Sequence, residues 1–396
     1  MFPIIPANSV AAAAGPNDEG IFGYGSSAGG YVAVTNLVSN TGVVSSDVAG
    51  VGTARYYAAA CEYGVGKGIF GYGSDDSDLS VSNLVSNTGV VSSDVAGVGT
   101  GRYGLAACSY GEDKGIFGFG YYTPVLTAIT NLVSNAGVVA SDTVGVGTAT
   151  NYSAACEYGE DKGIFGYGLS PSATAVTHLV SNAGVVSSDV TGVGTARQLP
   201  AACSYGEDKG IFGFGYGTAP GYTAITNLVS NAGVVATDTT GVGTGRNYLA
   251  ACEYGEDKAI FGYGFTGSVS SLSNLVSNVG VVATDVTGVG TARQIPAACS
   301  YGEDKGIFGY GYSGGALSMS NLVSNSGVIA TDVTGVGTAR WTLAACEYGQ
   351  DKGIFGYGTT GSKSSLTNLV SNAGVIATDV TGVGTARQSV AACSFN

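Results

Sequence analysis

The sequence predicts an all-β fold, an eight-bladed β-propeller of four-stranded antiparallel blades. The first observation is a repeat of about 47 residues, because GIFGYG at Gly20 and its close variants occur eight times. The second is composition, with 67 glycines and only 11% charged residues among 396. Glycine-rich turns between Val, Ile, Thr and Tyr, repeated at this period, are typical of units that bury a core only against their neighbours.

A complete repeat, residues 295–340, contains four strand-like runs. They are AACSY at 297–301, KGIFGYG at 305–311, LSMSNLV at 317–323 and VIATD at 328–332. The turns GED and SNSG supply Gly, Asn and Ser, which adopt the positive φ angles that hairpin turns require. No segment shows sustained helical periodicity. Each repeat is therefore expected to form one blade.

The first strand of the repeat indicates how the ring closes. It alternates between CEYG and CSYG, and the last copy, AACSFN, has the serine that its place in the alternation requires. We expect residues 388–396 to complete blade one, which leaves no open sheet edge. The alternative takes this strand from the N-terminal alanine run in SVAAAAGPNDEG. With closure by residues 388–396, residues 18–396 are expected to form one propeller, and the apolar residues 1–17 are an extension and a candidate docking segment.

The order of these features resembles the kelch repeat over essentially the whole chain. An arginine precedes a small-residue inner strand, a glycine-punctuated strand follows, and two further strands complete the unit. Spaced glycines such as Gly71 and Gly73 replace the kelch glycine pair, and the outer-strand tryptophan is missing. The resemblance implies the propeller architecture and carries over no binding residue.

The copies differ mainly between the second and third strands and directly after the arginine. In an up-and-down blade both segments lie on one face, and loops on a rigid scaffold often carry recognition. Tyr, Ser, Gly and Thr dominate there, as in antibody paratopes, and such rings also suit sugars. Drift of exposed loops is the alternative, although drift does not favour exposed aromatic residues. The candidate ligand-binding residues are Tyr31, Tyr56, Tyr57, Tyr121, Tyr122, Tyr222, Tyr248, Phe265, Tyr312 and Trp341.

Each repeat also has an aspartate eight residues before its arginine. This spacing suggests a carboxylate–guanidinium brace of the inter-blade loop, with a partner contact of the arginines as the alternative. In one copy Thr150 replaces the arginine, which would leave Asp142 without its partner. The brace residues are Asp47, Arg55, Asp94, Arg102, Asp189, Arg197, Asp379 and Arg387.

The sequence predicts no catalytic residues, no metal site and no cofactor. The eight cysteines, one per repeat, are interpreted as small buried residues and not as disulfides. His178 is the single histidine, which is too few for a histidine-based metal site or a catalytic triad. The GEDK turns offer too few oxygens for calcium. The cluster Asp75, Asp76 and Asp78 is interpreted as a solvated loop, with a cation site or a catalytic pair as the alternative.

Charge and hydropathy exclude several function classes. The net charge of −13 argues against nucleic-acid binding. No apolar run approaches the roughly 18 residues of a membrane span, so no membrane insertion is expected. The first basic residue is Arg55, so the sequence does not begin like a secretory signal.

The phrases LVSN, GVVATD, GVGTAR and KGIFGYG look like those of bacteriophage repeat proteins described as tail-fibre-like. This resemblance implies a non-enzymatic virion protein of the tail fibre or tail tip, extracellular after lysis. Its expected partners are a host-surface glycan or envelope protein and other virion proteins. The alternative is a structural connector or decoration protein that binds through the constant face. The sequence assigns no oligomeric state.

Overall fold

The computed structural model describes residues 18–395, except residues 49, 51, 144–146, 191, 218–220, 240–242, 334 and 381. The described residues form strands, isolated bridges, turns and loops, and none of them is helical. No helix in this part of the chain is therefore long and apolar enough to cross a membrane. The candidate docking segment 1–17 lies outside the described residues.

Eight three-stranded antiparallel sheets share one design, which sheet two illustrates. Its strands are β5 (Ala59–Tyr63), β6 (Lys67–Gly71) and β7 (Ser82–Val85), with β6 in the middle. The expected fourth strand, at residues 90–94, makes only isolated bridges such as Val85 with Val91. The sheets thus have three strands and a bridged fourth segment, because that segment leaves the sheet edge after one or two residue pairs.

The other sheets follow the same order, and a few two-residue strands decorate their loops. Sheet one contains β31 (Ala391–Phe395), β1 (Glu19–Gly23) and β4 (Thr35–Val38), and sheet three contains β8 (Ala106–Tyr110), β9 (Lys114–Gly118) and β12 (Thr130–Val133). Sheet four contains β13 (Ala154–Tyr158), β14 (Lys162–Gly166) and β17 (Thr177–Val180), and sheet five contains β18 (Ala201–Tyr205), β19 (Lys209–Gly213) and β20 (Thr226–Val229). Sheet six contains β21 (Ala250–Tyr254), β22 (Lys258–Gly262) and β23 (Ser273–Val276), and sheet seven contains β24 (Ala297–Tyr301), β25 (Lys305–Gly309) and β26 (Ser320–Val323). Sheet eight contains β27 (Ala344–Tyr348), β28 (Lys352–Gly356) and β29 (Thr367–Val370). The short strands are β2 (Ser26–Ser27), β3 (Gly30–Tyr31), β10 (Tyr121–Tyr122), β11 (Val125–Leu126), β15 (Leu169–Ser170), β16 (Ser172–Ala173) and β30 (Arg387–Gln388).

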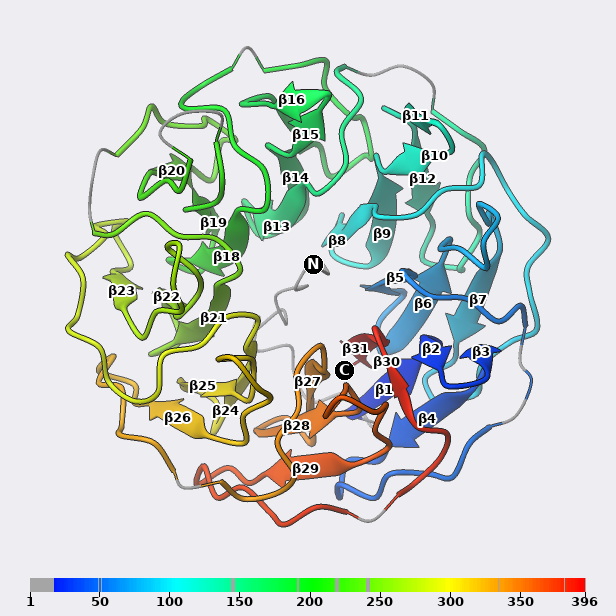
Figure 1. The fold of residues 1–396 in the computed structure, drawn as a ribbon. Helices are drawn as coiled ribbons and strands as arrows, with labels where there is room; N and C mark the ends of the chain where they lie inside the picture. The colour runs from blue at the N-terminus through cyan, green and yellow to red at the C-terminus, as the bar shows by residue number, and fades with distance from the viewer. Residues whose placement is uncertain are drawn as a thin grey trace.

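The sheets lie side by side around a common centre, with the first strand of each sheet innermost (Figure 1). Each first strand contacts the next along the chain, from β5 to β27, and β31 contacts both β27 and β5. The C-terminal strand β31 pairs antiparallel with β1, so that Cys393 lies opposite Ile21. The two ends of the described chain thus belong to one sheet.

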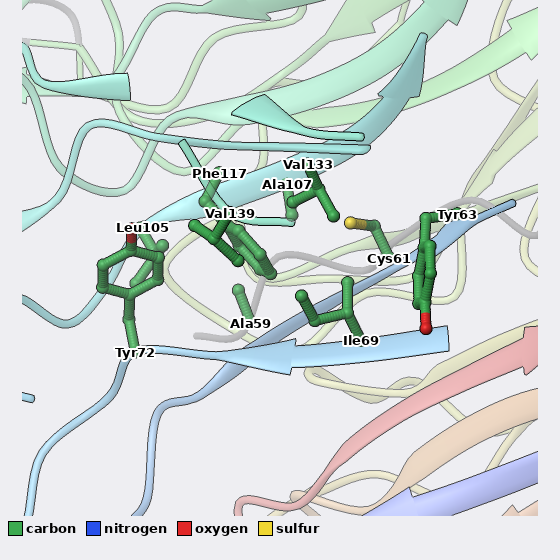
Figure 2. Packing of buried hydrophobic residues seen from close by; sticks show 10 residues of the cluster. All are labelled: Ala59, Cys61, Tyr63, Ile69, Tyr72, Leu105, Ala107, Phe117, Val133 and Val139. Atoms are coloured by element: carbon green, nitrogen blue, oxygen red, sulfur yellow. The ribbon is translucent and has the colours of Figure 1, made fainter. Parts of the chain in front are cut away.

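Neighbouring sheets are held together by apolar side chains from both. Figure 2 shows one such interface, in which Cys61, Ile69 and Tyr72 of sheet two pack with Phe117 and Val133 of sheet three. Ile69, Phe117 and Val133 have no exposed surface. The rings of Tyr72 and Phe117 meet edge to face, with centroids 5.3 Å apart. All eight cysteines are free and buried at equivalent positions.

The two glycines of the GIFG motif have separate packing roles. A Cβ added to Gly71 would lie 2.7 Å from the ring of Phe117 in the next sheet. A Cβ on Gly115 would lie 2.7 Å from the sulfur of Cys61 in the preceding sheet. Real Cβ atoms do not approach other atoms so closely, so glycine at both positions sets the spacing between sheets.

Candidate functional site

A buried arginine fixes the start of the variable segment in seven of the eight sheets. Arg55 is fully buried, and its guanidinium carbon lies 3.7 Å from the ring centre of Tyr24, as in a cation–π contact. Its Nη1 donates to the carbonyl of Thr53 at 3.0 Å, and its Nη2 donates to Oδ1 of Asn83 at 2.6 Å. Residues 56 and 57 follow directly, so their backbone begins from a rigid support.

The carboxylate near each arginine is not the one that the sequence spacing suggests. Nη1 of Arg55 lies 4.0 Å from Oδ1 of Asp94, and Nη1 of Arg387 lies 3.8 Å from Oδ1 of Asp47. The expected pairing of Asp47 with Arg55 is therefore wrong. The arginine stands at the entry into a sheet and the aspartate on the fourth segment of that same sheet, so the pair joins the two ends of one sheet. In sheet one this contact joins the C-terminal segment to residue 47.

Sheet four has Thr150 in place of the arginine and His178 in place of the asparagine that the other sheets have. Because the pairing is within one sheet, Thr150 leaves Asp189 without a guanidinium, and not Asp142 as the spacing suggests. Nε2 of His178 lies 2.6 Å from Oδ1 of Asp189, and the imidazole lies 4.5 Å from the ring of Phe119. Burial lowers the pKa of His178, against the hydrogen bond with Asp189, which raises it. The histidine is thus a structural substitute for the missing brace.

Five tyrosines form a continuous row on the loops of sheets one to three, which we call the tyrosine belt: Tyr31, Tyr56, Tyr57, Tyr103 and Tyr121. The rings of Tyr31 and Tyr56 are stacked, with centroids 4.6 Å apart and planes 3° apart. Tyr56 and Tyr57 are 4.2 Å apart. Tyr57 and Tyr103 are 6.1 Å apart, and Tyr103 and Tyr121 are 5.5 Å apart. All five side chains are half-buried, in contrast to the fully buried core tyrosines.

The acidic loop at residues 74–78 lies against the tyrosine belt. The hydroxyl of Tyr31 donates to Oδ1 of Asp76 at 2.6 Å, and this hydrogen bond raises the pKa of the Tyr31 phenol. The backbones of Tyr56 and Ser74 exchange two hydrogen bonds of 2.9 Å. The amide of Thr123 donates to Oδ2 of the third carboxylate, Asp78, at 2.6 Å. Two features that the sequence analysis considered separately therefore meet at one place.

The other aromatic candidates lie in smaller groups. Tyr222 contacts Tyr216 at 5.2 Å and Phe265 at 5.9 Å, between the loops of sheets five and six. Tyr312 and Trp341 are 5.2 Å apart. Two candidates join none of these ring contacts within the described residues: Tyr122, which is 47% exposed beside the belt, and Tyr248.

The sequence analysis missed Tyr103, which connects the two halves of the belt. Burial raises its pKa, and so do the nearby Tyr121 and Asp78. Tyr103 follows Arg102 directly, as Tyr56 follows Arg55, so a comparison of equivalent positions in the repeats identifies it as a candidate.

The first strands enclose a cavity of about 50 Å³ at the centre, room for a few water molecules. Glu62 and Glu157 line it, together with Ser109 and Ser394. Burial and the neighbouring carboxylates raise the pKa of Glu62 to about 8. Burial raises the pKa of Glu157 to about 7, partly offset by hydrogen bonds from Ser109. The alternation of Glu and Ser therefore separates carboxylates around the centre.

Comparison with known proteins identifies a fold and no family. No family model and no curated protein matches the chain. Among solved structures, a fungal alcohol oxidase of the AA5 family in complex with copper matches at 12% identity and a TM-score of 0.51. The match covers 99% of this chain and 88% of that one. A likeness at such low identity shows the fold alone.

The side chains that the structure describes do not fit a copper ion. Within residues 18–395, apart from the gaps named above, no group of three His, Cys, Asp or Glu side chains is arranged to hold a metal. Imidazole and thiolate are the usual protein ligands of copper. His178 is 2% exposed and engaged with Asp189, and burial raises the pKa of the cysteine thiols, which keeps them protonated. No oxidase chemistry is assigned to this chain.

The oxidase contradicts the expectation of a non-enzymatic virion protein. A solved structure that shares the architecture is an enzyme, and nothing in the comparisons described above points to a phage, a tail fibre or an adhesin. The virion role, the connector alternative and the assignment as a non-enzyme are therefore corrected. A propeller-like scaffold serves unrelated functions, which is why the repeat phrases alone misled.

Proposed function

We propose that the chain is an eight-bladed β-propeller that binds a saccharide on its tyrosine belt. The ring architecture is supported by the order of contacts among the first strands, which returns from β27 through β31 to β5. Pairing of β31 with β1 supplies the strand that blade one would otherwise lack.

The observation that carries the binding proposal is the row of half-exposed rings. Core tyrosines such as Tyr24 and Tyr72 have no exposed surface, whereas Tyr31, Tyr56 and Tyr121 remain accessible on loops. The C–H faces of a pyranose pack against aromatic rings, and phenol hydroxyls and carboxylates nearby accept or donate hydrogen bonds to its hydroxyls. A row of rings over three blades suits several consecutive sugar units.

The scaffold beneath the belt is rigid, which favours binding. Arg55 and Arg102 are fully buried and precede Tyr56 and Tyr103 directly. Arg102 donates from Nε to the carbonyl of Phe119 at 2.8 Å and from Nη2 to Oδ1 of Asn131 at 2.6 Å. Little conformational entropy is lost when a ligand meets side chains that are already held in place.

A binding assay with matched aromatic variants tests the proposal. The purified protein is applied to a glycan array, and the oligosaccharides that bind are titrated by calorimetry. We expect the double variant Tyr56→Ala, Tyr121→Ala to lose at least about tenfold in affinity, because each stacked ring contributes on the order of 1 kcal/mol. The matched control is Tyr312→Ala, Trp341→Ala, which removes an aromatic pair on other blades. Binding of no saccharide, or equal loss in both variants, would refute the proposal.

A further inference from the structure

Three carboxylates lie on a loop beside the tyrosine belt, and no ion pair among the described residues includes them. Resting on the saccharide-binding function above, we propose that the ligand of the belt carries an ammonium group, as an amino-sugar oligosaccharide does. Asp75, Asp76 and Asp78 stand on one loop between the belt residues of the first and third sheets. The combination of open tyrosine rings and carboxylates is complementary to a cation attached to a sugar.

No basic side chain among the described residues forms an ion pair with these carboxylates. None of the ion pairs in the described part of the chain includes Asp75, Asp76 or Asp78. Their contacts are with uncharged donors: Asp75 accepts from Ser77, Asp76 from the Tyr31 hydroxyl, and Asp78 from the Thr123 amide. These carboxylates therefore have no cationic partner among the described residues, and their position beside the belt favours a cationic ligand over an anionic sugar.

The hydrogen bond between Tyr31 and Asp76 strengthens the same preference. A phenol whose hydroxyl donates a hydrogen bond to a carboxylate gains electron density in its ring. The electrostatic attraction between an ammonium group and the face of that ring increases accordingly. Tyr31 is stacked on Tyr56, so the electron-rich ring belongs to the row on which the sugar is expected to lie. Asp76 thus acts as a positioning and polarising residue for Tyr31.

Other occupants fit the site less well. A neutral saccharide would pack on the rings and would partly desolvate the three carboxylates without giving them a cationic partner, which costs free energy. An acidic saccharide would be repelled. A basic peptide would match the charge, and it is therefore included as a competitor in the test.

The test compares oligosaccharides that differ only in charge. A tetrasaccharide of β-linked glucosamine and its N-acetylated form are titrated by calorimetry at mildly acidic pH, where the amino groups are protonated. We expect the amino form to bind about tenfold more tightly at low salt. The difference should shrink when ionic strength rises well above about 0.1 M, because the Debye length falls below about 10 Å.

Two triple variants locate the charge that matters. In Asp75→Asn, Asp76→Asn, Asp78→Asn, the affinity for the amino form should fall to that for the acetylated form. The matched control, Glu112→Gln, Glu160→Gln, Glu207→Gln, removes three charges from exposed turns between first and second strands and should keep the preference. Thermal unfolding of both variants verifies that they fold.

The outcomes separate this inference from the function on which it rests. Equal binding of the amino and acetylated forms would overturn the ammonium preference and leave saccharide binding intact. Loss of the preference in the glutamate control would also overturn it, because net charge and not the acidic loop would then be responsible. Binding of a lysine-rich peptide but of neither saccharide would refute both proposals.

Discussion

Nε2 of His178 lies 2.6 Å from Oδ1 of Asp189 in the one sheet whose entry has Thr150 in place of an arginine. Elsewhere the equivalent aspartate has an asparagine amide and a guanidinium near it, as Asp94 has Asn83 and Arg55. The imidazole also takes over the contact with the ring of Phe119. Two substitutions 28 residues apart thus compensate each other.

This compensation predicts a strong energetic coupling. His178→Asn alone leaves Asp189 with neither the imidazole nor a guanidinium, and Thr150→Arg alone places a guanidinium where the imidazole lies. Each single variant should lose about 1–3 kcal/mol of unfolding free energy, and the double variant should regain most of that loss. Urea denaturation of the four proteins measures the coupling. Additive losses in the double variant would contradict it.

The brace beneath the belt predicts a difference between two equivalent arginines. Arg55→Lys and Arg293→Lys should each lower the unfolding free energy by about 1–3 kcal/mol, because lysine cannot reproduce the forked hydrogen bonds of the buried guanidinium. Only Arg55→Lys should weaken saccharide binding, since Tyr56 and Tyr57 follow Arg55 directly. Calorimetric titration of both variants checks this. A similar loss of binding in Arg293→Lys would show that the brace acts through global stability.

The central glutamates predict a decrease in stability with rising pH. The folded pKa is raised to about 8 for Glu62 and to about 7 for Glu157 and Glu347, from an ordinary 4.5. Protonated, they stabilise the folded state fully below the unfolded pKa, and this contribution is lost as pH rises through the folded pKa values. The unfolding free energy should therefore fall between about pH 4.5 and pH 8.

A glutamine variant isolates this effect. Glu62→Gln keeps the shape of the protonated side chain and removes its titration, so the pH dependence of chemical denaturation should become shallower. At pH values above the raised pKa, the variant should be more stable than the natural protein. An unchanged slope would show that Glu62 is ionised in the folded protein without cost.

The C-terminal strand predicts a large effect from a single residue near the end of the chain. Phe395 is fully buried, and Phe395→Ala should cost about 3–5 kcal/mol of unfolding free energy. Lys363→Met is the control, because Nζ of Lys363 lies outside the apolar core and donates part-buried hydrogen bonds of 2.7 and 2.6 Å to Ser26 and Ser27. It should cost less than about 1 kcal/mol. Equal costs would contradict the role of β31 in the core.

Strand positions were predictable because their residues repeat under the same packing constraints. Gly71 and Gly115 must be glycine to approach Phe117 and Cys61, and the period of these contacts is visible in the sequence. The fourth strand was overpredicted. Val90 is 65% exposed, so the β-forming residues of that run do not all pack into a sheet.

The site was predictable in its residue types and not in its arrangement. Variation among copies selected Tyr31 and Tyr121, but the contact of Tyr31 with Asp76 joins residues 45 positions apart on loops that do not repeat. The partner of each brace arginine depends on which sheet the aspartate belongs to, and spacing alone does not specify this. The glutamates of the central cavity were visible only as an alternation, because their burial depends on contacts between the first strands of different sheets.

Pairing of β31 with β1 also determines the order of events during synthesis on the ribosome. The first sheet contains β31, which is translated after the other strands of the described residues, so β1 has an unpaired edge until β31 has been made. Contacts between strands so far apart in the sequence have a large loop-closure entropy cost and are expected to form late. A folding intermediate in which β31 has not yet docked therefore exposes the edge of β1, to which another chain could add a strand.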